Sequence, residues 1–161
     1  MPIYDRGDFR DNCGFGLLAH MDGEASHRLV RTAISALDRM DHRGAIGADG
    51  KTGDGCGLLM AAPTAVLRNA AAAAGIEPGE RFAAGLVFLS PSAEGAARAR
   101  RLLEELLTAE GLRPDGWRVV PTDSSVCGDQ ALESLPAIEQ IFVTAPEEME
   151  KLITIPLEKK L

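Results

Sequence analysis

Apolar and polar positions follow one another along the chain in a pattern that predicts strands and helices in turn. Short apolar runs bounded by turn residues predict strands at residues 15–21, 58–61, 82–89, 117–120 and 137–144. Apolar positions spaced three or four residues apart predict helices at residues 26–41, 64–74, 92–110 and 129–135, and the start of a last one at 147–152. This order predicts an α/β or α+β sandwich, and the pattern leaves open whether its strands are parallel or antiparallel.

Two of the predicted helices have a recognisable start. Ser26 and Ser92 each precede an apolar stripe, and a serine hydroxyl at this position can accept a hydrogen bond from a free amide of the first helical turn.

Residues 15–21 carry almost no charge, so we expect them to form a buried strand. We expect the stripe of the first helix to lie on a core; it consists of Leu29, Val30, Ala33, Ile34, Leu37 and Met40.

The composition is that of a globular protein. The chain has 161 residues, enough for one domain, with 45% hydrophobic and 25% charged residues. Its net charge of −7 argues against a surface for nucleic acid or an anionic membrane, because phosphate binding needs a basic patch. The sequence has no apolar run of about 18 residues that could span a membrane. We expect a cytoplasmic protein, and three widely spaced cysteines fit a reducing compartment.

The first candidate for chemistry is Cys13. It follows a polar leader, residues 1–12, whose removal would leave Cys13 with a thiol and a free α-amine, a nucleophile and its base in one residue. Such an amine titrates close enough to neutral pH to take up the thiol proton. Gly14 and Gly16 leave room for a substrate beside the sulfur. The plain alternative is a small buried cysteine with a structural role.

Two further motifs follow Cys13. His42-Arg43-Gly44 either ends a helix with basic residues or supplies Arg43 as a donor that orients a carboxylate or an amide. The run from Gly53 to Gly57 belongs to a segment, residues 43–57, that holds six glycines. It lacks the Gly-Lys-Ser/Thr ending of a nucleotide-binding loop, so we interpret it as a tight turn that borders the active site. His20 and His27 have no carboxylate or histidine partner at metal-ligand spacing, and we expect no metal site.

Taken in order, these motifs resemble the class II glutamine amidotransferase domain at the start of glutamate synthase large subunits. The similarity covers about residues 8 to 145. The run from Asp49 to Gly57 favours glutamate synthases over other class II amidotransferases, such as those that feed nucleotide or amino-sugar synthesis. The motifs that carry it are Cys13-Gly-Phe-Gly-Leu-Leu-Ala-His20, His42-Arg43-Gly44-Ala45, Asp49-Gly50-Lys51-Thr52-Gly53-Asp54-Gly55-Cys56-Gly57 and Gly116-Trp117-Arg118-Val119-Val120-Pro121.

The resemblance implies an α+β fold, the N-terminal-nucleophile α/β/β/α sandwich, of which only a part is present. It implies cleavage before Cys13, attack of the Cys13 thiol on the side-chain amide of L-glutamine, release of ammonia and hydrolysis of the thioester to glutamate. Arg43 and Gly14 would position the cysteine and the substrate. We expect a leader at residues 1–12, the first portion of the amidotransferase domain at 13–145, and a tail without a family motif at 146–161.

The resemblance also implies partners. The ammonia would reach 2-oxoglutarate in the remaining domains of the large subunit, which carry FMN and an iron–sulfur cluster. A small (beta) subunit would carry FAD and oxidise NADPH, and this chain itself would hold no cofactor. The motifs do not distinguish NADPH, NADH and ferredoxin as the electron donor.

One part of the family pattern is missing from the sequence. The family takes its oxyanion donors from an Asn-Gly pair, whereas Asn12 and Asn69 are followed by Cys13 and Ala70. Loss of one such donor costs on the order of 100- to 1000-fold in rate, so we expect the chain alone to turn over little or no glutamine. The alternative is a non-catalytic α/β fragment or interaction module, which an unchanged phenotype of Cys13→Ala would favour.

Overall fold

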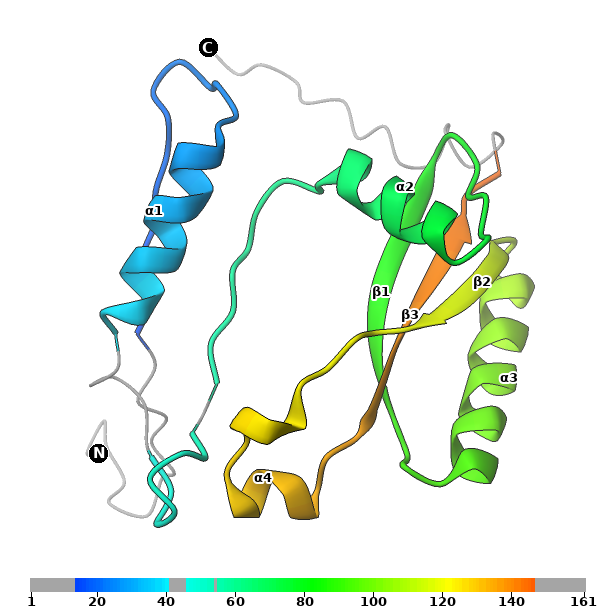
Figure 1. Cartoon of the computed structure of the whole chain (residues 1–161). Helices are drawn as coiled ribbons and strands as arrows, with labels where there is room; N and C mark the ends of the chain where they lie inside the picture. Colours follow the sequence, from blue (N-terminus) through cyan, green and yellow to red (C-terminus); the bar gives the residue numbers. More distant parts are fainter. Residues whose placement is uncertain (1–13, 41–45, 54, 147–161) are drawn as a thin grey trace, which may run out of the picture. The chain divides into compact units, whose positions relative to one another are not determined.

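The computed structural model describes residues 14–40, 46–53 and 55–146, which form helices and strands in mixed order (Figure 1). The chain divides into two compact units. Unit 1 comprises Met1–Met60 and Ser125–Glu133, and it holds the helices α1 (His27–Asp38) and α4 (Asp129–Glu133). Unit 2 comprises Ala61–Ser124 and Ser134–Leu161, and it holds a sheet with two helices. A short 3-10 turn, η2 (Ser124–Val126), lies where the chain passes from unit 2 to unit 1.

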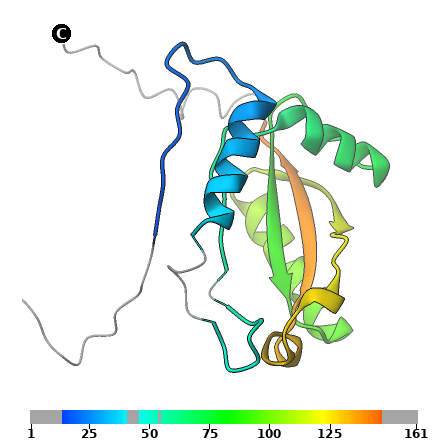
Figure 2. The ribbon, with the colours of Figure 1, turned by 60° about the vertical axis from the view of Figure 1, so that its left-hand side comes forward.

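The sheet of unit 2 has three antiparallel strands in the order β1-β3-β2. The apolar runs predict β1 (Phe82–Leu89) and β3 (Ala137–Thr144) correctly, with these bounds. Figure 2 shows β1 and β3 side by side. The third strand, β2 (Arg113–Val119), begins earlier in the sequence than predicted. Among the described residues, the strand that comes last in the sequence is therefore the centre of the sheet.

A bulge explains why β2 extends past a proline. Pro114 has no amide to donate, so it fits only at an edge strand or an irregularity of the ladder. The pairing with β3 shifts between Pro114 and Gly116, which leaves Asp115 as the extra residue. The Asp115 side chain is buried; it accepts hydrogen bonds from Arg113 Nε at 2.8 Å and from the Thr144 hydroxyl. These bonds stabilise the bulge that the sequence pattern does not indicate.

The helix α2 (Thr64–Ala73) covers one face of the sheet. Its Ala71 packs with Ile76 and Phe142 in the buried core, and Phe142 is fully buried at the middle of β3. Phe82 of β1 packs on Phe142 with 6.4 Å between the ring centroids. This core is made of the side chains that α2 and one face of the sheet bring together.

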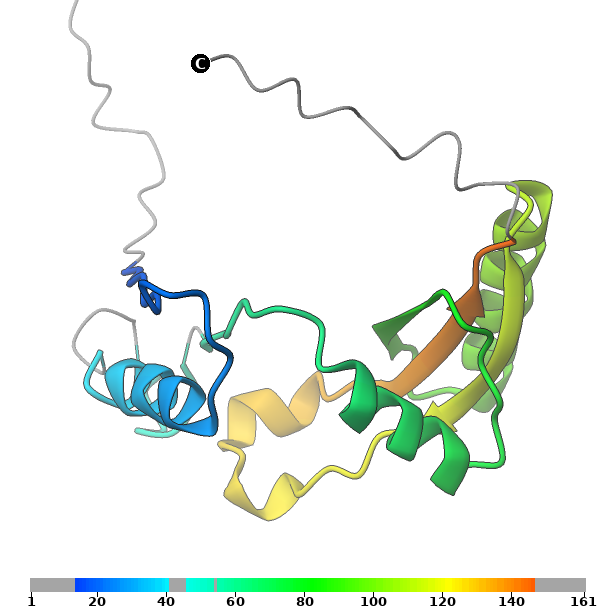
Figure 3. The ribbon, with the colours of Figure 1, turned by 90° about the horizontal axis from the view of Figure 1, so that it is seen from above.

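The helix α3 (Ala93–Ala109) covers the opposite face, as the view from above shows (Figure 3). Its start is confirmed, because Ser92 Oγ accepts from the Gly95 amide at 3.3 Å. Two polar contacts tie it to the sheet. Arg100 pairs with Glu139 of β3, and the Trp117 indole of β2 donates to Glu104 at 2.6 Å. Mixed helices and an antiparallel sheet agree with the predicted α+β class at this coarse level.

Three of the predictions for unit 1 are wrong or only partly right. Residues 15–21 and 58–61 form no strand, since the part of the chain that the structure describes offers them no ladder partner; Phe15 and Leu59 are 95% and 100% exposed. The start of α1 is confirmed, because Ser26 Oγ accepts from the Leu29 amide at 3.2 Å. However, no residue of α1 is buried, so its apolar stripe does not lie on a core. In unit 2, the predicted helix at 147–152 lies outside the described residues.

Candidate functional site

Gly14 is the predicted site residue that the structure places. It is exposed and belongs to no helix or strand, and a Cβ added to nearby Gly16 would meet no atom within 4 Å. Cys13 and Arg43 lie outside the described residues, so their roles stay predictions. The described chain resumes three residues after Arg43, at the glycine-rich segment.

Residues 46–53 form a tight turn closed at both ends. Ile46 and Gly53 pair through an isolated antiparallel bridge, and the Gly47 amide donates to the Thr52 carbonyl at 2.6 Å. Gly50 takes a φ of +69°, in the region that favours glycine, and its amide donates to the Gly47 carbonyl at 3.0 Å. The abundance of glycine in this segment thus has a conformational reason.

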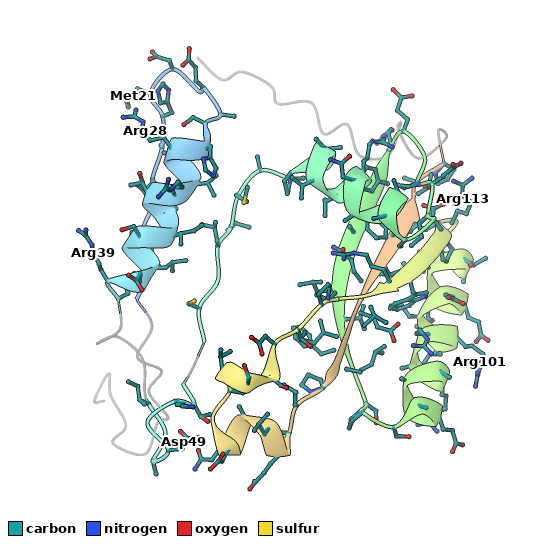
Figure 4. The ribbon with its side chains drawn as sticks, viewed as in Figure 1. Met21, Arg28, Arg39, Asp49, Arg101 and Arg113 are labelled. Atoms are coloured by element: carbon teal, nitrogen blue, oxygen red, sulfur yellow. The ribbon has the colours of Figure 1, made fainter. Side chains whose placement is uncertain are left out.

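The Asp49 carboxylate holds this turn together (labelled in Figure 4). Its Oδ1 accepts from the amides of Lys51 at 3.0 Å and Thr52 at 2.8 Å, and its Oδ2 accepts from the Thr52 hydroxyl. The amide of Gln130 in α4 donates to Oδ2 at 3.4 Å. Gly128 is buried against the same groups, and a Cβ there would overlap Asp49 Oδ2 and Thr52 Oγ1. We call Asp49, Thr52, Gly128 and Gln130 the Asp49 cluster.

The hydrogen bonds of the Asp49 cluster favour the charged carboxylate. The Thr52 hydroxyl, then the amides of Thr52 and Lys51, hold the pKa of Asp49 well below its ordinary value, against a smaller opposing effect of burial. A carboxyl with a lowered folded-state pKa stabilises the fold fully above its unfolded pKa of about 3.9 and loses that contribution as pH falls toward the folded-state pKa. The contribution of Asp49 to the stability of the turn is therefore lost in acid.

We expect an NMR titration of the Asp49 carboxyl carbon to give a midpoint well below the ordinary aspartate value. Thr52→Val removes the hydroxyl donor at nearly the same size, and it should raise the midpoint toward the ordinary value because the largest stabilising hydrogen bond is gone. An ordinary midpoint in the unchanged protein would show that the Asp49 cluster is not formed in solution.

The sequence indicates only the two members of the Asp49 cluster that lie in the turn, Asp49 and Thr52. The spacing of Asp49 and Thr52 around Gly50 is typical of a turn in which an aspartate binds backbone amides ahead of it, and this signal could have indicated a role for Asp49. Gly128 and Gln130 lie some eighty residues away. No short-range pattern connects them to the turn, so only the structure identifies them.

Comparison with known proteins places this chain in a family. The family model for class II glutamine amidotransferases matches residues 13–161. The chain belongs to the class II glutamine amidotransferases. This confirms the family that the ordered motifs predict, and the matched region of this amidotransferase begins at Cys13.

Several glutamate synthases are similar to this chain. It is 43% identical over 146 residues to the ferredoxin-dependent glutamate synthase 2 of a Synechocystis species, covering 86% of this chain and 9% of that protein. It is 34% identical over 151 residues to the glutamate synthase [NADPH] large chain of Bacillus subtilis, covering 94% of this chain and 10% of that protein. It is 38% identical over 142 residues to the glutamate synthase [NADPH] large chain of Azospirillum brasilense, covering 87% of this chain and 9% of that protein. The chain thus spans about a tenth of the length of the curated relatives it matches.

Among residues 14–40, 46–53 and 55–146, no three His, Cys, Asp or Glu side chains come together in a way that could hold a metal ion. Within the same ranges, no helix is long and apolar enough to cross a membrane. A rice relative is named as chloroplastic, so the cytoplasmic location stays a prediction.

Proposed function

We propose that this chain is the first part of the glutamine-hydrolysing domain of a glutamate synthase, with Cys13 as its nucleophile. The observation that carries the proposal is the start of the family match at residue 13, the cysteine itself, directly after the polar leader. An amino-terminal cysteine provides its own base, so the boundary and the chemistry agree. The names of the relatives support glutamate synthase as the larger protein.

The proposed reaction needs few groups. After residues 1–12 are removed, the Cys13 α-amine takes the thiol proton and the sulfur attacks the side-chain carbonyl carbon of glutamine. A carbon–sulfur bond forms, the carbon–nitrogen bond breaks, and the amine returns the proton to the departing nitrogen, which leaves as ammonia. Water then attacks the thioester, the carbon–sulfur bond breaks, and glutamate leaves with the thiol restored. Arg43 and Gly14 position the cysteine and the substrate, and the proposal assigns no oxyanion donor within the chain because it contains no Asn-Gly pair.

The complete protein would use this ammonia elsewhere. In this proposal the N-terminal-nucleophile sandwich includes unit 2, and 2-oxoglutarate is aminated in the remaining domains of the large subunit. FMN and an iron–sulfur cluster would lie on those domains, and FAD and NADPH on the small subunit. The donor groups of the described residues do not fit a metal cluster, so we derive no step through one on this chain.

We expect the purified chain to lose residues 1–12 and to react at Cys13 with a diazoketone analogue of glutamine. The thiol protonates the diazo carbon, a carbon–sulfur bond forms and dinitrogen leaves, so a single modification should appear by intact mass and peptide mapping. Excess L-glutamine should prevent it, and Cys13→Ser should abolish it.

Cys56 provides the internal control, because it is an exposed free thiol of the same chain. Cys56→Ser should leave the labelling unchanged. A retained leader would contradict the proposed nucleophile, and so would modification that glutamine does not prevent or that falls equally on Cys56; either result favours the non-catalytic alternative.

A further inference from the structure

We propose that Asp49 is a positioning residue for the amidotransferase site, because its carboxylate fixes the turn that lies between Arg43 and the glycine run ending at Gly57. This inference rests on the proposed function. It goes beyond that function by assigning a role to a side chain that does not touch the substrate in the proposed reaction.

The Asp49 cluster does more than close a local turn. Bonds from Oδ1 to the amides of Lys51 and Thr52 would be enough for an aspartate turn at the surface. The second carboxylate oxygen instead accepts from the Thr52 hydroxyl and from the Gln130 amide of α4. The turn is thereby held against a segment far along the chain, and both belong to unit 1.

The side chains of Asp49 and Thr52 pack closely against Gly128. This glycine is buried, and its missing Cβ is the space that the Asp49 carboxylate and the Thr52 hydroxyl occupy. Gly47 is similarly close, since a Cβ there would lie 2.9 Å from Gln130 Oε1. The turn and the segment around Gly128 thus meet at two places, and at each of them a glycine of one segment lies against side chains of the other. A carboxylate with four donors in such a contact has little freedom to move.

In the sequence, the turn lies between two predicted motifs, His42-Arg43-Gly44 and the glycine run that ends at Gly57. Ile46 and Gly53 are paired, so the chain enters and leaves the turn at adjacent points. Glycines after Gly53 set little direction of their own, because glycine has the widest choice of backbone conformations. Gly55 has a φ of +78°, and a Cβ on either Gly55 or Gly57 would meet no atom within 4 Å. The course of the described residues 55–57 therefore depends on where the turn is fixed. Arg43 precedes the turn by three residues in the sequence.

The test compares two reagents on Cys13 of the full 161-residue chain. The diazoketone analogue of glutamine needs an ordered substrate site, whereas iodoacetamide needs only an accessible thiolate. Asp49→Ala should slow the diazoketone reaction by roughly tenfold to a hundredfold, the effect expected of a small misplacement, and leave the iodoacetamide rate within about twofold. Asp49→Asn keeps one acceptor for the turn amides and should lie between the two. Asp22→Ala, an exposed aspartate of the same unit, should change neither rate.

Each outcome supports or overturns the inference. A selective loss in Asp49→Ala with partial recovery in Asp49→Asn supports it. Equal slowing with both reagents, or no slowing with either, overturns it while the unchanged protein still labels at Cys13 and the proposed function stands. If Asp49→Ala does not fold, the same comparison on Asp49→Asn decides, and a ratio of rates equal to that of the unchanged protein overturns the inference. Absence of glutamine-protected labelling in the unchanged protein overturns the proposed function and the inference together.

Discussion

Phe142→Ala is expected to lower the free energy of unfolding of unit 2 by about 3–5 kcal/mol, the range for removing a large aromatic side chain from a core. Phe142 is fully buried at the centre of the sheet, where it contacts Phe82 and the α2 residues around Ala71. A domain has only about 5–15 kcal/mol of stability, so this loss is a large part of the free energy of unfolding. Urea unfolding followed by the fluorescence of Trp117, the single tryptophan of the chain and a residue of β2, measures it.

Phe88→Ala is the matched control, because it makes the same change in the same sheet. Phe88 lies on β1 and is 66% exposed, so its removal should cost less than about 1 kcal/mol, as for most surface substitutions. Phe142→Leu should cost less than Phe142→Ala because it leaves a smaller cavity. Equal losses in Phe142→Ala and Phe88→Ala would contradict the core described for unit 2.

Gly128→Ala is expected to disrupt unit 1 without unfolding unit 2. The added methyl group would overlap the Asp49 carboxylate and the Thr52 hydroxyl, so the turn at residues 46–53 must move away or lose its hydrogen bonds. Overpacking of this kind costs about 1–3 kcal/mol. Hydrogen exchange at the Lys51 and Thr52 amides, which both donate to Asp49, should therefore become roughly five- to 150-fold faster.

Gly57→Ala tests whether this effect is specific to the Asp49 cluster. Gly57 lies in the same unit, and a Cβ there would meet no atom within 4 Å. Its replacement should leave the exchange of Lys51 and Thr52 almost unchanged, and the Trp117 unfolding curve should stay the same in both variants. Slow exchange at Thr52 in Gly128→Ala would show that the contact between the two segments is absent in solution.

The sequence predicts the elements of unit 2 better than those of unit 1 for a physical reason. β1 and β3 are apolar runs that find hydrogen-bonded partners, and Ser92 caps α3 as its type and position indicate. The runs at residues 15–21 and 58–61 have the same local character but no ladder partner within the described chain. A strand depends on its neighbours more than on its own residues, so apolar character alone could not decide these segments.

The candidate site, too, can be predicted only in part from the sequence. Ordered motifs were enough to predict the family and to propose Cys13 and Arg43, because those arguments need only the order of residues along the chain. Gly128 looks like any other glycine in the sequence, and its role becomes visible only when Asp49 lies against it. Contacts between distant segments carry no local signal.

The strand order of unit 2 also has a consequence for how the protein is made. β1 and β2 both pair with β3, which follows them in the chain, and the sheet order places no pair between β1 and β2 themselves. During synthesis on the ribosome, the two outer strands are therefore complete before their common partner exists. Pairing between distant segments is slow, and unpaired strands such as β1, with Leu86 and Phe88 exposed, are where a nascent chain aggregates. The sheet would then close in one late step, when residues 137–144 leave the ribosome.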